Sequence, residues 1–497
     1  MLKNPKVWIH DHKLDSQVRF EDLLKASENV ASQISDNSLT ERDIVHYVGE
    51  NSVALISIFC GITFNDWIPV GSNPSAGVSE ISRNIDATDS KALAISKELF
   101  SKFKKIESKS LRRIFVYQVK DTDAFELEIE KIVVNENLSN ELNDKEELDD
   151  IAFMTMTSGS TGLPKAVMID GNRLVAGYTS LRRESSSEVA FISIGCQPFC
   201  NVGGLSHLMA ALFASINYIF MEGFDCKEFL NAVQRHECNY LLATPAMLNS
   251  ISKYPDLDSY DFSNVYIIGT GGAKVNFESV KMIKEKTGIN DEAVFGQSYG
   301  MSECFISHFC LSKITNIPQH LGKPLENIEC QIIDPNELTE LSANTEGEIC
   351  LDSPYVMRGY YKDRKKTESV FLGRFFRTGD LGKIDEEGNL FVTGRIKDVI
   401  KFRAFSVFPA ELENVLLSHD SVSSAAVMGE HHDEHGEIPV AFVCVKSAVT
   451  EEELLIYVAE HVTDYKRIHK IYFHERLPLN NGMKIDKVRL KKSLPNN

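Results

Sequence analysis

A loop rich in hydroxyl groups and glycines is the stretch of the sequence best suited to hold phosphate oxygens. The apolar run 151–156 predicts the end of a strand, and TSGSTGLPK follows it from Thr157 to Lys165. Glycines let the main chain approach a ligand closely, while hydroxyls, free amides and a lysine supply donors and positive charge. The loop is not the P-loop of nucleotide triphosphatases, because that motif needs Gly-Lys-Ser/Thr in succession and Lys165 precedes Ala166. We therefore expect a differently built phosphate cradle.

Charged residues in later motifs supply further groups that phosphate chemistry needs. Glu303 ends FGQSYGMSE and offers a hard oxygen ligand suited to Mg²⁺, which takes few carboxylates beside phosphate oxygens and water. Asp380, in RTGDLG, can accept two hydrogen bonds, and Arg395, in GRIKD, presents a planar fork of donors. Lys484 follows LPLNNGM near the end of the chain. A lone charged residue is mostly surface decoration, so it is the ordered series of motifs that indicates function.

Taken in order, these motifs resemble the signature blocks of the adenylate-forming superfamily: acyl- and aryl-CoA synthetases, beetle luciferases and stand-alone adenylation enzymes. The resemblance covers nearly the whole chain. It implies an acid–thiol ligase in which ATP and a fatty or aryl carboxylic acid give acyl-AMP and pyrophosphate. The acyl group then passes to coenzyme A or to the phosphopantetheine of an acyl carrier protein. The implied cofactors are ATP, Mg²⁺ and coenzyme A or phosphopantetheine.

The resemblance also implies roles for individual residues. The nucleotide-binding positions belong to the signature loop and to four later motifs, and they are Thr157, Ser158, Gly159, Ser160, Thr161, Gly162, Lys165, Gly271, Gly272, Ala273, Tyr299, Gly300, Ser302, Asp380 and Arg395. The implied metal ligand is Glu303, and the implied catalytic residues are Lys484, Glu303 and Lys401. The implied acid pocket contains Cys200, Asn201 and Ser298.

The sequence departs from the family pattern at the acid pocket and at the acceptor passage. Asn201 replaces the usual histidine, and no acidic residue stands beside Cys200 to pair with a substrate ammonium, which favours a plain carboxylic acid. Ser298 stands where many members have glycine, so we expect a slightly shallower pocket. Ala404 replaces the family glycine that lines the narrow passage for the pantetheine arm.

Alternating helices and strands must position these motifs. Periodic apolar residues predict helices at 20–34 and 53–63. Short apolar runs bounded by turn residues predict strands at 67–70, 92–95, 114–119, 132–134, 191–194, 240–243 and 266–268. Strands separated by helical segments indicate an α/β fold (α+β overall), with a large layered N-terminal domain of mixed sheets. We expect Gly203 and Gly204 to form a tight turn before a helix.

The resemblance implies an N-terminal AMP-binding domain at 1–396 and a small mobile α+β domain at 397–497, with a hinge at Lys397. In the smaller domain, Pro409 should open one helix, and Thr450 with Glu453 should form a capping box for another. The block GEICLDSPYVMRGYY, 347–361, is expected to be a β-hairpin at the rim of the large domain.

Composition limits the partners and the compartment. The chain has 497 residues and a formal net charge of −18, which argues against nonspecific binding to nucleic acid or to anionic membranes. Its ten cysteines include no CxxC pair, so buried thiols in a reducing compartment are expected. There is no signal-peptide core and no peroxisomal ending, and the longest apolar run, 53–64, is too short to span a bilayer. We therefore predict a cytoplasmic protein.

Two alternatives to a thiol ligase stay open. One is an adenylating enzyme that passes its acyl group to an amine. The other is a degenerate member that binds nucleotide as a regulatory module, although the retained Glu303, Asp380, Arg395 and Lys484 speak against it.

Overall fold

The protein folds into two compact units. The computed structural model describes residues 8–104, 106, 108–120, 125–134, 148–158, 164–175, 191–214, 216–403, 405–479 and 485–494. The first unit contains the chain up to Pro318 together with Leu325–Ile328 and Ser353–Phe371. The second contains Gln319–Pro324, Glu329–Asp352 and the chain from Leu372 onward. No helix among the described residues has the length and apolar character required to cross a membrane.

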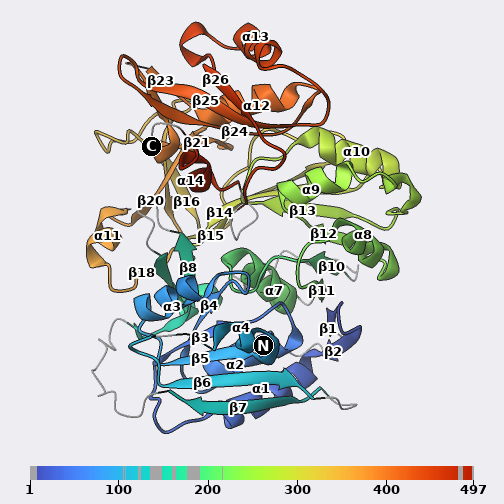
Figure 1. The fold of residues 1–497 in the computed structure, drawn as a ribbon, viewed down its shortest axis with the longest axis vertical. Helices are drawn as coiled ribbons and strands as arrows, with labels where there is room; N and C mark the ends of the chain where they lie inside the picture. Colours follow the sequence, from blue (N-terminus) through green and yellow to red (C-terminus); the bar gives the residue numbers. More distant parts are fainter. Residues whose placement is uncertain are drawn as a thin grey trace. The chain divides into compact units, whose positions relative to one another are not determined.

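One mixed eight-stranded sheet of the first unit is ordered β15-β14-β13-β12-β10-β11-β1-β2 (Figure 1). Its strands are β1 (Trp8–Asp11), β2 (Ser16–Arg19), β10 (Ile192–Gly195), β11 (Asn217–Phe220), β12 (Tyr240–Leu242), β13 (Ile267–Gly271), β14 (Val294–Met301) and β15 (Phe305–Lys313). The inner strands are parallel, and β2 and β15 close the two edges as antiparallel strands.

The other eight-stranded sheet of the first unit is ordered β18-β9-β8-β4-β3-β5-β6-β7. Its strands are β3 (Ile44–Val48), β4 (Ile68–Ser72), β5 (Ala92–Ser96), β6 (Arg113–Val119), β7 (Leu127–Val133), β8 (Ile151–Ser158), β9 (Pro164–Asp170) and β18 (Gly359–Tyr360). Parallel pairing of β3, β4, β5, β6 and β8 is flanked by antiparallel β7 and β9. The prediction of mixed sheets is confirmed.

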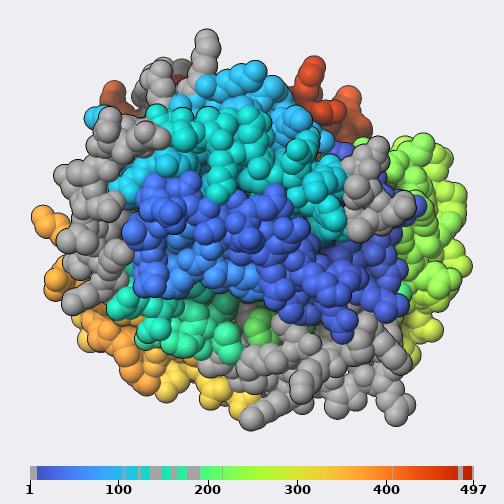
Figure 2. All heavy atoms as spheres, turned by 90° about the horizontal axis from the view of Figure 1, so that it is seen from below, coloured from blue at the N-terminus to red at the C-terminus, as the bar shows by residue number. Residues whose placement is uncertain are grey.

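The first unit has a core that both sheets share. Its helices are α1 (Phe20–Ile34), α2 (Val53–Phe64), α3 (Val78–Ala87), α4 (Lys97–Phe103), α7 (Val202–Ala214), α8 (Cys226–Arg235), α9 (Pro245–Ser252), η1 (Leu257–Ser259), α10 (Phe277–Thr287) and α11 (Arg364–Ser369). Apolar side chains of α2 and α7 pack with residues of both sheets. The amphipathic α1 covers α2 and lies beside the edge strand β7 on the surface (Figure 2). Both predicted helices are confirmed.

The second unit contains two five-stranded sheets. One is built from β16 (Glu329–Ile333), β17 (Gly347–Asp352), β20 (Phe375–Ile384), β19 (Phe371–Leu372) and β21 (Leu390–Arg395). The other is built from β22 (Ile400–Phe402), β23 (Phe405–Val407), β24 (Val422–His432), β25 (Gly436–Val445) and β26 (Lys470–Phe473). The helical segments are η2 (Ile396–Asp398), α12 (Pro409–Ser418), α13 (Glu451–His461), η3 (Asp464–Lys466) and α14 (Lys487–Lys491). Pro409 opens α12, and Thr450 with Glu453 forms the capping box of α13, as predicted.

The predicted hairpin at 347–361 is wrong. β17 pairs with β16 and β20 in the second unit, whereas β18 pairs with β9 in the first. The chain bends at Ser353, whose carbonyl accepts the amide of Val356 and whose hydroxyl accepts the amide of Tyr355, and Pro354 has no amide to continue a ladder. The sheet of β17 therefore belongs to the same compact unit as the C-terminal residues. The predicted domain boundary at Lys397 was placed at a hinge between moving parts, and it stays a prediction.

Candidate functional site

One edge of the first sheet gathers most of the predicted site residues that the structure describes. Because β10, β12, β13 and β14 are parallel neighbours, their carboxyl ends lie at the same edge. The loop after β10 contains Cys200 and Asn201. Gly271 ends β13 and 272–273 follow it, and 299–303 lie at and just after the end of β14. The order reverses beside β10, with β11 on one side and β12 on the other. Crevices at such reversals are where open α/β sheets bind ligands.

Hydrogen bonds from the side chain of Asn51 fix the loop after β10. The side-chain amide of Asn51 donates to the carbonyls of Gln197 and Met221 at 2.9 and 3.0 Å and accepts the amide of Phe199 at 2.9 Å. Burial raises the pKa of the Cys200 thiol to about 12, so it stays protonated and is no nucleophile. The loop itself contains no carboxylate, but the carboxylate of Glu50 lies near enough to contribute to the raised pKa of the Cys200 thiol.

The glycines after this loop have a different role from the predicted one. Gly203 and Gly204 lie in the first turn of α7, not in a turn before it. A Cβ on Gly204 would lie 2.3 Å from the carbonyl oxygen of Pro198. The start of the helix therefore packs directly on the main chain of the preceding loop, which only glycine permits.

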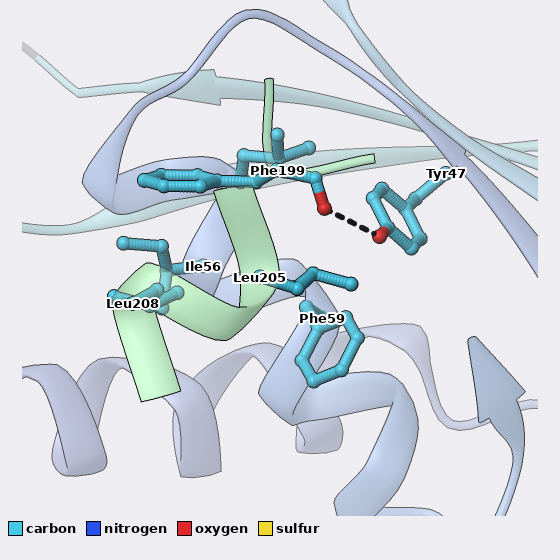
Figure 3. A pocket seen from close by; sticks show the side chains of 7 residues that line it. Tyr47, Ile56, Phe59, Phe199, Leu205 and Leu208 are labelled. Atoms are coloured by element: carbon cyan, nitrogen blue, oxygen red, sulfur yellow. Dashed lines mark hydrogen bonds between the residues drawn. The ribbon is translucent and has the colours of Figure 1, made fainter. Parts of the chain in front are cut away.

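A small apolar cavity lies under the same loop, between α2 and α7 (Figure 3). Its lining residues are Tyr47, Leu55, Ile56, Phe59, Phe199, Leu205 and Leu208. The Tyr47 hydroxyl donates to the carbonyl of Phe199 at 3.0 Å and so has its polar partner. With no converging polar groups, the cavity is part of the core that supports the loop.

Small residues stand at the strand ends next to this loop. Gly272 has a φ of +80°, a left-handed conformation that favours glycine, and Gly272 and Ala273 are exposed. A Cβ on Gly271 would lie 2.1 Å from the hydroxyl of Ser298, which donates to the carbonyl of Thr270 at 3.0 Å. Ser298 is thus turned against the neighbouring strand. The assignment of adenine to this place stays a prediction.

Tyr299 is largely covered by protein. Its side chain is 8% exposed, and its ring lies 6.1 Å from the ring of His308 on β15. Burial lowers the pKa of His308 to about 4, so this neighbour is neutral. A Cβ on Gly300 would lie 1.7 Å from the carbonyl oxygen of Phe305. Strands β14 and β15 approach each other so closely here that residue 300 has no room for a side chain. That Tyr299 stacks on adenine is not tested by these contacts.

The side chains of Glu303 and Lys165 both contact Tyr360, a residue that was not predicted from the sequence. The Tyr360 hydroxyl donates to Glu303 Oε1 at 3.0 Å, and Lys165 Nζ lies 5.2 Å from the centre of the Tyr360 ring. Burial first, and then the Glu303 carboxylate, raise the pKa of Tyr360 well above its usual value. The Gly-Tyr-Tyr run was a visible signal, but nothing in it indicates a partner far away in the sequence. Ser302 is half-buried beside Glu303.

The signature loop is described only at its base. Thr157 pairs with Lys165 across β8 and β9. The side chain of Ser158 and the residues Gly159, Ser160, Thr161 and Gly162 lie outside the described residues, so their phosphate-binding role stays a prediction.

A second group of predicted residues meets in the second unit. Arg395 Nε lies 2.8 Å from Asp380 Oδ1, and the two residues are register partners on β20 and β21. Glu348, another residue missed from sequence, accepts Arg377 Nε and Nη2 at 2.9 and 2.6 Å. Its other oxygen accepts the amide of Gly379 at 3.1 Å, and Gly379 has a φ of +72°. Glu348 therefore fixes the turn that presents Asp380.

The remaining predicted residues of the second unit are only partly described. Lys401 has an exposed side chain on β22, and its amide donates to Glu437 Oε2 at 2.9 Å. Lys397 lies in the single turn η2. Ala404 and Lys484 lie outside the described residues, so the structure does not test either assignment.

The donors present fit Mg²⁺ shared with phosphate. Glu303 is a half-buried carboxylate with one oxygen held by a phenol, and Mg²⁺ typically takes one or two carboxylates and completes its shell with phosphate oxygens and water. Among the described residues, no group of three or more histidine, cysteine, aspartate and glutamate side chains could hold a metal by itself.

Comparison with known proteins agrees with this geometry. Residues 4–361 match the family model described as AMP-binding enzyme, and residues 411–484 match that of the AMP-binding enzyme C-terminal domain. The chain is 28% identical to a 4-coumarate–CoA ligase of Pinus taeda over 97% of this chain and 91% of the relative.

Two solved structures have the same fold. The amide bond synthetase McbA of Marinactinospora thermotolerans superposes with a TM-score of 0.82 at 23% identity, covering 98% of this chain and 96% of its own. The o-succinylbenzoate coenzyme A synthetase MenE of Bacillus subtilis, in complex with ATP and magnesium, gives 0.80 at 24% identity, covering 98% and 97%.

Proposed function

The chain belongs to the AMP-binding enzyme family, and from this premise we propose that it activates a carboxylic acid with ATP and passes the acyl group to a thiol. The observation that supports this most is the shared sheet edge, which gathers the loop of Cys200 and Asn201, the glycines 271–273 and the motif that ends at Glu303. An acid and a nucleotide need such adjacent subsites to react directly.

The proposed first step is attack of the carboxylate on the α-phosphorus of ATP. A bond forms between the carboxylate oxygen and the α-phosphorus, and the bond to the bridging oxygen of the β-phosphate breaks, so pyrophosphate leaves. Negative charge grows on the phosphate oxygens, where fixed positive groups stabilise it. Lys165 and the signature loop would hold the phosphates, Asp380 the ribose and Glu303 the metal. When bound, Mg²⁺ would neutralise phosphate charge.

The proposed second step is transfer of the acyl group to the sulfur of coenzyme A, with AMP as the leaving group. The described loop after β10 offers no carboxylate for a substrate ammonium, which supports a plain fatty or aryl acid. A carrier-protein phosphopantetheine is a second possible thiol. Transfer to an amine is the competing proposal, supported by Ala404 in place of the family glycine and by the fold shared with an amide bond synthetase.

Acid-dependent exchange of pyrophosphate into ATP tests the proposed function. We expect exchange with at least one class in a panel of aryl, short, medium and long acyl acids, and none without acid. Exchange absent with every class, from protein that still binds ATP, would leave a nucleotide-binding regulatory module as the better proposal. Analysis of the product with coenzyme A or an amine then identifies the acceptor.

Ala404→Gly distinguishes the acceptors. If a pantetheine arm passes this residue, removing one methyl should speed thioester formation severalfold and leave pyrophosphate exchange unchanged, because tight passages respond to single methyl groups. The measurement is acyl-CoA formation from supplied acyl-AMP. Stable acyl-AMP with no thioester from coenzyme A or a carrier protein, in both wild type and variant, would favour the amine acceptor.

Lys397→Pro tests the proposed hinge. The two half-reactions need different groups at one site, so the chain at Lys397 should change its backbone dihedral angles between them. Proline fixes φ near −65° and should impair thioester formation at least tenfold more than pyrophosphate exchange. Equal loss of both half-reactions, or of neither, would contradict an alternation of the two domains.

A further inference from the structure

Tyr360 contacts two of the proposed site residues at once. Its hydroxyl donates to Glu303 Oε1 at 3.0 Å, and its ring lies 5.2 Å from Lys165 Nζ. The three side chains come from β18, from the turn after β14 and from β9. Tyr360 is 6% exposed, so both contacts are largely shielded from water. Polar contacts are stronger in such a shielded environment than in water.

Hydrogen bonding of its main chain fixes the position of Tyr360. The residue pairs with Val167 on β9, and its amide donates to Thr367 Oγ1 at 2.9 Å. A few residues earlier, the amide of Met357 donates to the carbonyl of Glu303 at 2.7 Å. The same segment thus bonds to the main chain of Glu303 and to the strand of Lys165. A rigid backbone of this kind suits a side chain whose task is orientation.

We propose that Tyr360 is the positioning residue that orients Glu303 toward a bound metal and Lys165 toward the phosphates of ATP. The phenol holds one carboxylate oxygen, which directs the other toward the ligand, and the ring face holds the ammonium. This inference rests on the proposed function, because it takes Glu303 as the metal ligand and Lys165 as a phosphate contact.

The test separates the two contacts by using Mn²⁺ as the metal probe and a nonhydrolysable ATP analogue, with no acid present. Tyr360→Phe removes the hydroxyl and keeps the ring. It should weaken Mn²⁺ binding in the presence of the analogue about tenfold, as expected for a lost hydrogen bond to a charged group, and leave metal-free binding of the analogue unchanged. Electron paramagnetic resonance measures free Mn²⁺. Tyr360→Leu should also weaken metal-free binding of the analogue severalfold, because the ring is lost.

Tyr361 provides the matched control. It is also 6% exposed and has a lysine over its ring, with Lys362 Nζ 5.5 Å from the centroid. Tyr361→Phe should leave both binding constants at wild-type values. Wild-type Mn²⁺ affinity in Tyr360→Phe, or an equal loss in Tyr361→Phe, would overturn the proposal. Failure of the proposed function would appear separately, as missing acid-dependent exchange in the wild type.

Discussion

Replacing Lys484 by alanine should slow acyl-adenylate formation about 10²- to 10³-fold, the effect typical of removing one group that stabilises transition-state charge. Lys484 keeps its spacing after LPL and stays in frame with Ile485 and Asp486, but Met483 precedes it where the family has glycine, and Gly482 stands one position early. In the proposed mechanism its ammonium is needed only while pyrophosphate leaves. Thioester formation from supplied acyl-AMP should therefore change far less than acid-dependent pyrophosphate exchange.

Lys492 is the matched control for this prediction. It lies near the same end of the chain and is exposed, so Lys492→Ala removes an equal charge without removing a proposed catalytic group. Its exchange rate should stay at the wild-type value. Near-normal exchange by Lys484→Ala would remove Lys484 from the mechanism, and equal losses in both variants would point to the general charge of this region.

Replacing Glu348 by alanine should lower the stability of the second unit by about 3 kcal/mol, the low end of the range measured when one partner of a buried ion pair is removed, because the Arg377 side chain is 24% exposed. Glu348 is 3% exposed and accepts both Arg377 and the amide of Gly379. The variant would leave a guanidinium and a main-chain amide without their acceptor. Glu346→Ala, on an exposed neighbour, should cost almost nothing.

Urea denaturation can assign this loss to the second unit. The two tryptophans, Trp8 and Trp67, both belong to the first unit, so tryptophan fluorescence follows that unit, while circular dichroism follows both. We expect an earlier transition by circular dichroism for Glu348→Ala. A loss below about 1 kcal/mol, no larger than that of an exposed pair, would contradict the structural importance of the Glu348–Arg377 pair.

Local features were predictable because local residues determine them. The helix at 20–34 follows from its apolar period, and the uniformly apolar α2 is buried as its composition requires. Pro409 and Thr450 begin helices for reasons contained within four residues. The resemblance also selected Asp380 and Arg395, which the fold places in contact.

The features that were missed depend on long-range pairing. Tyr360 and Glu303 are 57 residues apart, and Arg377 and Glu348 are 29 apart, so no local pattern indicates either contact. The hairpin predicted at 347–361 was wrong for the same reason, since β18 pairs with the distant strand β9 and not with β17, the preceding strand in the sequence. The roles of all the predicted site residues stay predictions, and Gly159 to Gly162, Ala404 and Lys484 also lie outside the described part of the chain.

The strand order beside β10 has a consequence for how this enzyme could diversify. Cys200 and Asn201 follow one strand, while the glycines 271–273 and Glu303 follow two others. On the proposed assignment of Cys200 and Asn201 to the acid pocket, a mutational library confined to 196–201 should alter acid preference while the proposed nucleotide-binding residues keep their own scaffolds. The library should not extend to Gly204, because a side chain there would clash with the main chain of Pro198. Ser298, the third residue of the predicted acid pocket, stands on β14 beside the nucleotide motif, so changes at Cys200 and Asn201 should disturb nucleotide binding less than changes at Ser298.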